Sequence, residues 1–344
     1  MTKGNHNLTI NGEEIAPGQQ KTLMLKMPEL YDWTPLSMPV HVIRGKQPGP
    51  TLCVTAAIHG DEVNGVEVVR RLLKRSALKK LTGTLIAVPI VNIYGFLYQN
   101  RYLMDRRDLN RCFPGSEKGS LAARLAHLVT TELIAKSTHI IDLHAGSLHR
   151  TNLPQIRANI DDAATKDLAH AFNVPVILHA ELRDGSMREY ATSQGIPFLL
   201  YEAGESLRFD EVSIRSGVNG ILSVMVALGM LPPQKLATRH IEPTVVRHSY
   251  WVRAPRSGVF RPHKGLGKSV KEGEVLATIA NPTGREEHKV LVPDSGIIIG
   301  KSNFPMTHEG AALFHIACYD KPHHVAEQVE NLQEVFAEYD VDSL

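Results

Sequence analysis

The sequence predicts an α/β fold followed by a smaller all-β domain. Between residues 51 and 228, continuous apolar segments alternate with segments whose apolar residues recur at three- and four-residue spacings. This alternation predicts strands joined by helices, and hence a mainly parallel sheet with helices on both faces. After about Pro243 the segments become short and are separated by Gly and Pro, which predicts the all-β domain. The predicted units are an N-terminal β segment over 1–50, an α/β domain over 51–242, an all-β domain over 243–322 and a tail over 323–344.

The elements of the α/β domain follow from their apolar patterns. Short apolar runs such as residues 40–43 predict a few strands before the domain, and the unbroken run 51–58 predicts a strand buried on both faces. Apolar residues from Val63 to Leu73 lie on one side of a predicted helix. Further strands are predicted over 85–91, 138–143, 174–178 and 198–201, and helices over 121–135, 161–172, 187–194 and 210–228.

The region after Pro243 contains only short predicted strands, over 252–255, 258–260, 274–279, 289–292 and 296–299. It resembles the hammerhead of biotinyl and lipoyl carrier domains, which carry the cofactor on a lysine in the hairpin after the equivalent of the 274–279 strand. Here that hairpin is Asn-Pro-Thr-Gly, over 281–284, so we expect no carrier function. We expect the domain to shield the active-site mouth or to mediate assembly. Residues 323–339 fit either a helix or a loose tail.

Composition narrows the class of protein. The 344 residues contain 38 basic and 36 acidic side chains, and a net charge of +2 argues against electrostatic capture of nucleic acid or acidic membranes. The first ten residues lack an apolar signal region, and the longest apolar stretch, 221–231, is too short to cross a bilayer. Three widely spaced cysteines fit neither a disulfide framework nor a cysteine zinc site. We therefore expect a cytoplasmic protein, and its 17 histidines make a metal site worth seeking.

Two short motifs follow predicted strands. His59 and Glu62 come directly after the strand that ends at Ile58, and His144 follows the strand 138–143. In an open parallel sheet, ligands bind outside the carboxyl ends of the strands. Catalytic zinc commonly takes two histidines and one carboxylate, which leaves a position for water. Either motif alone also fits a purely structural role, but their shared position predicts a metal site.

These motifs also carry a family resemblance. His59-Gly60-Asp61-Glu62, the segment 108–115 (Asp-Leu-Asn-Arg-Cys-Phe-Pro-Gly), the segment 142–146 (Asp-Leu-His-Ala-Gly) and the segment 202–204 (Glu-Ala-Gly) occur in the order found in the succinylglutamate desuccinylase/aspartoacylase family. That family belongs to the zinc carboxypeptidase superfamily, and the resemblance covers about residues 51–231. It implies a zinc-carboxypeptidase-like mixed sheet flanked by helices, with an antiparallel edge. It also implies one Zn²⁺ per chain, held by His59, Glu62 and His144.

The resemblance assigns the catalytic groups as well. Glu202 matches the family's catalytic glutamate, and a carboxylate is a suitable base for taking a proton from water and passing it to the leaving nitrogen. Glu205, three residues later, is the structural competitor. Arg101 matches the cation that stabilises the developing oxyanion. Its segment is longer than in the aspartoacylases, so Arg106 and Arg107 remain open as substitutes.

Asn110 and Arg111 match the family's clamp on a substrate carboxylate, and a planar guanidinium suits bidentate binding of that group. Arg157 and Arg188 are candidates for a second acidic group. Cys112 has no base beside it in sequence, so we expect packing and not a nucleophile. Of the remaining histidines, only His149, close after His144, is worth following as a site candidate.

The resulting hypothesis is a zinc-dependent hydrolase that cleaves a linear amide in a small N-acyl amino acid or related compound. The expected partner is a small molecule that bears a carboxylate, with no nucleic acid and no membrane. A homo-oligomer remains open. A zinc carboxypeptidase acting on short peptides is the nearer alternative, and it needs an extended groove. A zinc-stabilised binding protein is more remote, because it has no need of Glu202 or Arg101.

Overall fold

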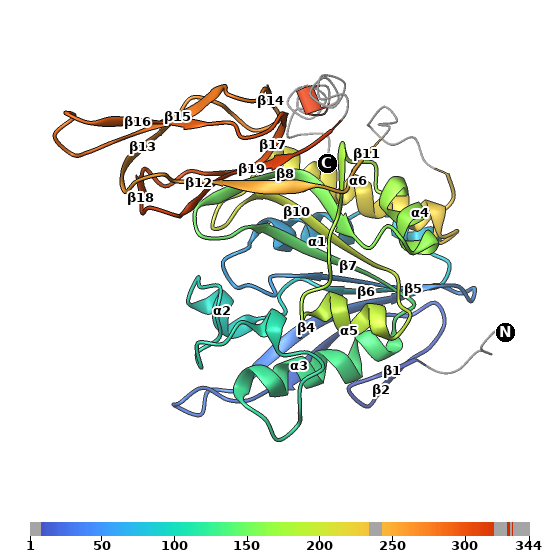
Figure 1. Cartoon of the computed structure of the whole chain (residues 1–344). Coiled ribbons are helices and arrows are strands. Elements are labelled where there is room, and N and C mark those ends of the chain that lie inside the picture. Colours follow the sequence, from blue (N-terminus) through green and yellow to red (C-terminus); the bar gives the residue numbers. More distant parts are fainter. Residues whose placement is uncertain (1–7, 234–242, 320–328, 331, 333–344) are drawn as a thin grey trace.

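Thirteen strands form one mixed sheet in the computed structural model, which describes residues 8–233, 243–319, 329–330 and 332 (Figure 1). The strands of the whole structure are β1 (Leu8–Ile10), β2 (Glu13–Ile15), β3 (Gln20–Met27), β4 (Leu36–Arg44), β5 (Thr51–Ala56), β6 (Thr84–Val88), β7 (His139–Gly146), β8 (Arg150–Ala158), β9 (Val176–His179), β10 (Phe198–Glu205), β11 (Thr244–Val246), β12 (Ser249–Arg253), β13 (Gly258–Pro262), β14 (Ser269–Val270), β15 (Val275–Ala280), β16 (Glu287–Leu291), β17 (Gly296–Ser302), β18 (Met306–Thr307) and β19 (Ala312–Ala317). The main path of the sheet runs β12-β19-β17-β8-β10-β7-β5-β6-β4-β3.

The centre of this sheet is parallel and its flanks are antiparallel. Strands β6, β5, β7 and β10 pair in parallel, whereas β8 joins β10 antiparallel and β4 joins β6 antiparallel. The expectation of a mainly parallel sheet was therefore too simple, and the mixed sheet implied by the family resemblance is confirmed. Parallel strands end at one edge, so the segments after β5, β7 and β10 meet there.

Helices cover both faces of the parallel centre (Figure 1). In β5, Leu52 and Val54 pack with apolar residues of α1, α4 and α6, while Cys53 packs on the opposite face with residues of α3 and α5. This alternation is the period of two that places successive strand side chains on opposite faces. The helices are α1 (Asn64–Leu73), α2 (Ile93–Leu97), α3 (Leu121–Glu132), α4 (Ala163–Ala171), α5 (Met187–Ser193) and α6 (Glu211–Ala227), with 3₁₀ turns at Ser76–Lys80, Leu109–Arg111 and Ile134–Lys136.

Five of these helices begin where the sequence provides a capping side chain, one of them being α2, where the Asn92 side chain accepts the N–H of Gly95. In the other four, the side chains of Ser120, Asp162, Ser186 and Asp210 each accept a hydrogen bond from the backbone N–H three residues later. The cap at Ser120 was predicted from the sequence. Helix α3 ends at Glu132, short of the predicted residue 135, because the chain tightens there into a 3₁₀ turn.

The chain after Pro243 divides between two sheets. Strands β12, β17 and β19 extend the large sheet through the pairing of β17 with β8. Strands β16, β15, β13 and β18 form a separate antiparallel sheet, which projects at the upper left of Figure 1. The tail predicted over 323–339 lies almost entirely outside the described residues. The boundary at residue 243 stays a prediction.

Strand β8 was missed by the sequence analysis, as were β19 and the short strands β11, β14 and β18. Strand β8 contains Asn152, Gln155 and Arg157 among its apolar residues, so it lacks the continuous apolar run by which its neighbours were recognised. It is nevertheless buried, because it lies between β10 and β17. No helix within the described ranges has the length and apolar character needed to cross a membrane.

Candidate active site

The carboxyl ends of β5 and β7 bring two histidines and a glutamate together. His59 and Glu62 lie in the turn between β5 and α1, and His144 lies near the end of β7. One ligand atom from each residue falls within 4.8 Å of the others. All three are buried, with exposed fractions of 3%, 2% and 4%. The predicted set thus converges in space, as expected for neighbouring parallel strands.

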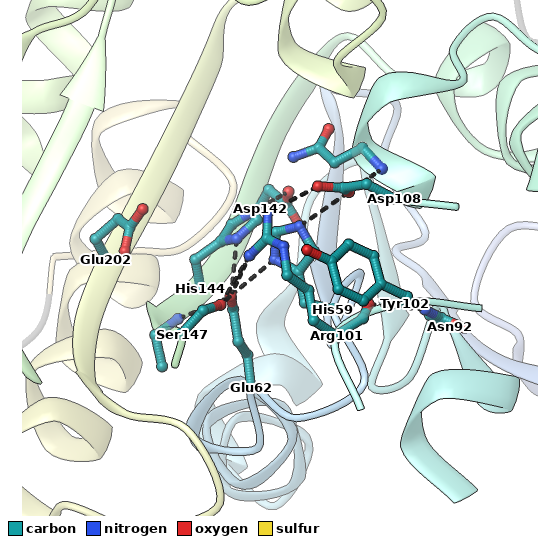
Figure 2. Close-up of polar contacts among 12 residues, drawn as sticks. His59, Glu62, Asn92, Arg101, Tyr102, Asp108, Asp142, His144, Ser147 and Glu202 are labelled. Atoms are coloured by element: carbon teal, nitrogen blue, oxygen red, sulfur yellow. Dashed lines mark hydrogen bonds and ion pairs between the residues drawn. The ribbon is translucent and has the colours of Figure 1, made fainter. Parts of the chain in front are cut away.

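The two imidazoles present the same nitrogen to the carboxylate (Figure 2). Nδ1 of His59 lies 2.8 Å from Oε1 of Glu62, and Nδ1 of His144 lies 2.9 Å from Oε2. Figure 2 also shows that the other ring nitrogens point away from this meeting point, toward Asp142 and Asp108. The three side chains therefore offer two Nδ1 atoms and a carboxylate to one position, which matches the donor set of catalytic zinc.

Two aspartates face the outer nitrogens of these rings. Nε2 of His144 hydrogen-bonds Oδ2 of Asp142 at 2.6 Å, and the hydroxyl of Thr55 donates to the other oxygen of Asp142. Nε2 of His59 faces Asp108 at 3.3 Å, too poorly aligned for a hydrogen bond. A carboxylate behind a ligating histidine fixes the tautomer that leaves the inner nitrogen free to bind metal.

The mutual charges of these groups shift their pKa values. Burial alone disfavours a charged imidazole, but the carboxylates of Asp142 and Glu62 outweigh it and raise the pKa of His144. For Glu62, burial opposes ionisation, yet the facing histidines hold its pKa well below the usual value. Burial likewise opposes ionisation of Asp108, but His59 and Arg101 lower its pKa. The mutual charges within the cluster of His59, Glu62 and His144 therefore keep the carboxylates of Glu62 and Asp108 ionised.

Arg101 lies beside this cluster. Its guanidinium donates to the hydroxyl of Ser147 at 2.7 Å and to Asp108 at 2.9 Å, and it approaches Glu62 at 3.5 Å. Ser147 in turn donates to Glu62 at 2.6 Å. The substitutes left open by the sequence, Arg106 and Arg107, are both exposed and do not line the pocket described below. Of the three arginines, only Arg101 is placed beside the predicted metal ligands.

Glu202 stands to one side of the cluster in Figure 2. It is paired with His144 in the β10–β7 register, so its side chain leaves the sheet beside a predicted metal ligand. Its carboxylate accepts a 2.6 Å hydrogen bond from the amide of Asn152 and lies 3.7 Å from Arg157. The competitor Glu205 does not line the pocket, and its carboxylate accepts a hydrogen bond from Asn303 instead.

Asn110 and Arg111 lie on the 3₁₀ turn that follows Asp108, and both line the pocket. The Asn110 amide oxygen accepts the backbone N–H of Met187 at the start of α5, so its NH₂ group is the part left to meet a ligand. The guanidinium of Arg111 donates to the backbone carbonyl of Asn110. Cys112 lies next to them but hydrogen-bonds the carbonyl of Asp108, and it does not line the pocket.

These residues line a cavity of about 780 Å³. Its lining includes seven arginines and four carboxylates, a balance that favours anionic ligands. Arg188 is buried in the wall, where its guanidinium donates to the backbone carbonyls of Ala180 and Glu181. Burial, with repulsion from Arg157 and Arg183, lowers the pKa of Arg188 to about 10.

The C-terminal strands supply another part of the cavity wall. Trp251 of β12 stacks on His315 of β19 with ring centroids 4.6 Å apart, and both line the cavity. His315 is buried, and its Nε2 lies 3.0 Å from the hydroxyl of Ser249. Burial, assisted by Arg157, lowers its pKa to about 3, so it is neutral at pH 7. Residues of this region therefore line the cavity, and its expected role in shielding the active-site mouth or in assembly stays a prediction. His149 instead stacks on Phe304 and does not line the cavity.

Comparison with known proteins supplies the family. Residues 48–228, more than half of the chain, match the model of the succinylglutamate desuccinylase/aspartoacylase catalytic domain. The chain belongs to the succinylglutamate desuccinylase/aspartoacylase family. The recognition made from the four sequence motifs is confirmed, and with this membership the chain is a hydrolytic amidase.

Several known proteins are similar to this chain over most of their length. The N-alpha-acetyl-L-2,4-diaminobutyric acid deacetylase of Halomonas elongata is 28% identical over 274 residues, which cover 75% of this chain and 79% of that protein. A succinylglutamate desuccinylase from Silicibacter sp. has a TM-score of 0.78 at 25% identity, over 88% of this chain and 97% of its own. The product-bound ectoine utilization protein EutE (DoeB) of Ruegeria pomeroyi has a TM-score of 0.80 at 24% identity, over 87% and 95%, and supports the fold.

The sequence analysis of this desuccinylase/aspartoacylase-family chain missed several residues around the predicted site. Asp142 and Asp108 lie within motifs that were quoted, but their orientation toward the histidines depends on the folded strands. Asn152 lies on β8, which was not recognised as a strand. His315 and Trp251 reach the cavity through pairing of distant strands, and no short motif marks them.

Proposed function

We propose that the chain is a zinc-dependent deacylase that hydrolyses a linear amide in a small N-acyl amino acid bearing a carboxylate. The observation that carries this proposal is the convergence of His59, Glu62 and His144 at one position of an arginine-rich cavity that Glu202 also lines. The named activity of the Halomonas elongata relative, a deacetylase of an N-acetyl amino acid, supports the reaction class.

The donor set fits zinc. Two Nδ1 atoms and a carboxylate face one another without a fourth protein ligand among the described residues, and Asp142 and Asp108 stand behind the rings. In this assignment His59, Glu62 and His144 hold one ion per chain. When bound there, zinc lowers the pKa of coordinated water and polarises the substrate carbonyl.

Glu202 is the proposed general base. Its carboxylate lines the cavity beside His144, where it can take a proton from the attacking water and return it to the leaving nitrogen. Arg101 is the proposed oxyanion-stabilising group, because its guanidinium is held in the cluster by Asp108 and Ser147. Asn110 and Arg111 are proposed to donate hydrogen bonds to a substrate carboxylate, the first through its free NH₂ group.

The test is substitution of Glu202 with Gln, which preserves size but cannot accept the proton. We expect kcat to fall about 100- to 10,000-fold while the bound zinc, measured by elemental mass spectrometry, is unchanged. Glu205→Gln is the matched control, since Glu205 is the last residue of the same strand but does not line the cavity; it should stay within about threefold of the unmodified enzyme. Activity would be followed on a panel of N-acyl amino acids with acidic, neutral and basic side chains.

Near-normal turnover by the Glu202→Gln protein on any substrate that the unmodified enzyme cleaves would refute the assignment of the base. Absence of zinc from the unmodified protein, together with undiminished turnover after chelation, would refute metal dependence.

A further inference from the structure

Asn152 lies on β8, between a strand of the central sheet and a strand from the C-terminal region. In the large sheet, β8 is flanked by β10, which carries Glu202, and by β17 from the C-terminal region. The register pairs Asn152 with Gly204 on one side and with Gly300 on the other. A bulge separates Glu202 from Gly204 in the β10–β8 ladder, and across it the Asn152 side chain reaches Glu202.

The contact between Asn152 and Glu202 has a defined polarity. The Asn152 amide nitrogen donates to Oε2 of Glu202 at 2.6 Å, and Asn152 is only 6% exposed. The reversed amide would place two acceptor oxygens against each other, so only one orientation is compatible with an ionised Glu202. Among the described residues this is the one hydrogen bond to the Glu202 carboxylate, because Arg157 at 3.7 Å is beyond hydrogen-bond distance.

The other end of the same amide packs on the C-terminal strand. A Cβ atom placed on Gly300 would lie 3.0 Å from Oδ1 of Asn152 and 3.1 Å from the Cβ of His315. That separation is shorter than an ordinary van der Waals contact, so a side chain at position 300 would press on the amide. Glycine at position 300 therefore lets the backbone of β17 lie close to the amide oxygen of Asn152.

We propose that Asn152 is a positioning residue that fixes the orientation of the Glu202 carboxylate, and that β17 sets Asn152 through the close approach at Gly300. This inference rests on the proposed role of Glu202 as general base. A glutamate has three rotatable side-chain bonds, and a short hydrogen bond to its charged group selects one orientation among many. The C-terminal region thereby contributes to catalysis through the sheet, in addition to lining the cavity.

The first test is Asn152→Ala in the zinc-loaded, full-length enzyme. We expect kcat to fall about 10- to 100-fold with KM within about threefold, since the base is misaligned while the substrate contacts remain. Zinc content and the thermal midpoint should stay close to those of the unmodified enzyme. Asn159→Ala is the matched control, because Asn159 directly follows β8 and its amide oxygen only accepts the N–H of Asp161.

The second test is a double-mutant cycle that combines substitutions at Gly300 and Asn152. Gly300→Ala should lower kcat about three- to tenfold in the unmodified enzyme, with Gly265→Ala as control because a Cβ there would meet nothing within 4 Å. In the Asn152→Ala background, Gly300→Ala should cause no further loss, since the pressed oxygen is gone. If Asn152→Ala does not fold, the kcat of the Gly300→Ala protein, which removes no polar group, decides the inference alone.

The outcomes separate this inference from the proposed function. Normal kcat in both the Asn152→Ala and the Gly300→Ala protein, while Glu202→Gln abolishes turnover, overturns the positioning role only. An equal loss from Gly300→Ala in both backgrounds overturns the link through Asn152 and directs attention to His315. High activity in the Glu202→Gln protein overturns the assigned base, and this inference with it.

Discussion

The cluster of His59, Glu62 and His144 and the cavity wall that faces it are assembled in different ways. His59, Glu62 and His144 come from the ends of two adjacent parallel strands, so each side chain is placed by the strand that directly precedes it or contains it. The wall combines β8, the segment before and within α5, and the C-terminal strands β12 and β19. The chemistry of the first region depends on local chain geometry, whereas that of the second depends on pairing between distant segments.

The two regions also differ in how their charges are compensated. In the cluster, Glu62, Asp108 and Asp142 each contact at least one histidine or Arg101. In the wall, Arg157 and Arg188 repel each other, and Glu202 is the carboxylate that attracts Arg188. Unlike the cluster, the wall leaves positive charge uncompensated by the described residues. We infer that the cluster is organised for a cation and the wall for an anionic substrate.

The largest effect is expected from breaking the cluster. His144→Ala removes one of the three converging ligands and leaves Glu62 and Asp142 without their shared partner. We expect loss of bound zinc and a fall in kcat/KM of roughly 1,000-fold or more, since both metal activation of water and carbonyl polarisation are lost. Metal analysis of the purified protein and initial rates on the best N-acyl amino acid are the measurements.

His149→Ala provides the control for that experiment. His149 is close in sequence but exposed, and it contacts Phe304 and not the cluster. It should retain about one zinc per chain and nearly normal activity. Equal metal loss in both variants, or full zinc retention by His144→Ala, contradicts the assignment of the ligands.

This contrast explains what the sequence could reveal. The buried run of β5 and the alternation of strands and helices predicted the parallel centre, and the rule for strand ends then placed His59 and His144 at one edge. The neighbourhood of Glu202 could not be derived in this way. Strand β8 mixes Asn152 and Arg157 with apolar residues because its polar side chains face the cavity, so its pattern does not resemble that of a buried strand.

The wall should respond more weakly than the cluster, and in a different kinetic constant. Arg188→Met removes a buried guanidinium that has no carboxylate partner within ion-pair distance among the described residues. For an acidic substrate we expect KM to rise about 30-fold, the loss of one charge-assisted hydrogen bond of about 2 kcal/mol, with kcat within about threefold. Arg256→Met, on an exposed turn, is the control. A fall in kcat alone, with KM unchanged, contradicts a binding role for this wall.

The smallest expected effect is on the free energy of unfolding, and it concerns His315 in the C-terminal part of the wall. His315 has a pKa of about 3 in the folded protein, lowered by burial and by Arg157, against 6.5 for the ordinary side chain. Between pH 3 and pH 6.5 the unfolded chain therefore binds more protons than the folded protein. The contribution of His315 to the free energy of unfolding is complete above pH 6.5 and is lost as the pH falls toward 3. At pH 5.5 the loss is about 1 kcal/mol relative to pH 8. His315→Phe keeps a ring against Trp251 but cannot take up a proton, so its free energy of unfolding should fall less on acidification by that amount.

Urea unfolding of the unmodified and the His315→Phe protein at pH 8 and pH 5.5 measures this difference. The titration of the cluster of His59, Glu62 and His144 is common to both proteins and cancels. Identical losses in the two proteins would show that His315 is not held neutral by the wall, and that the acid sensitivity of the fold arises from other groups.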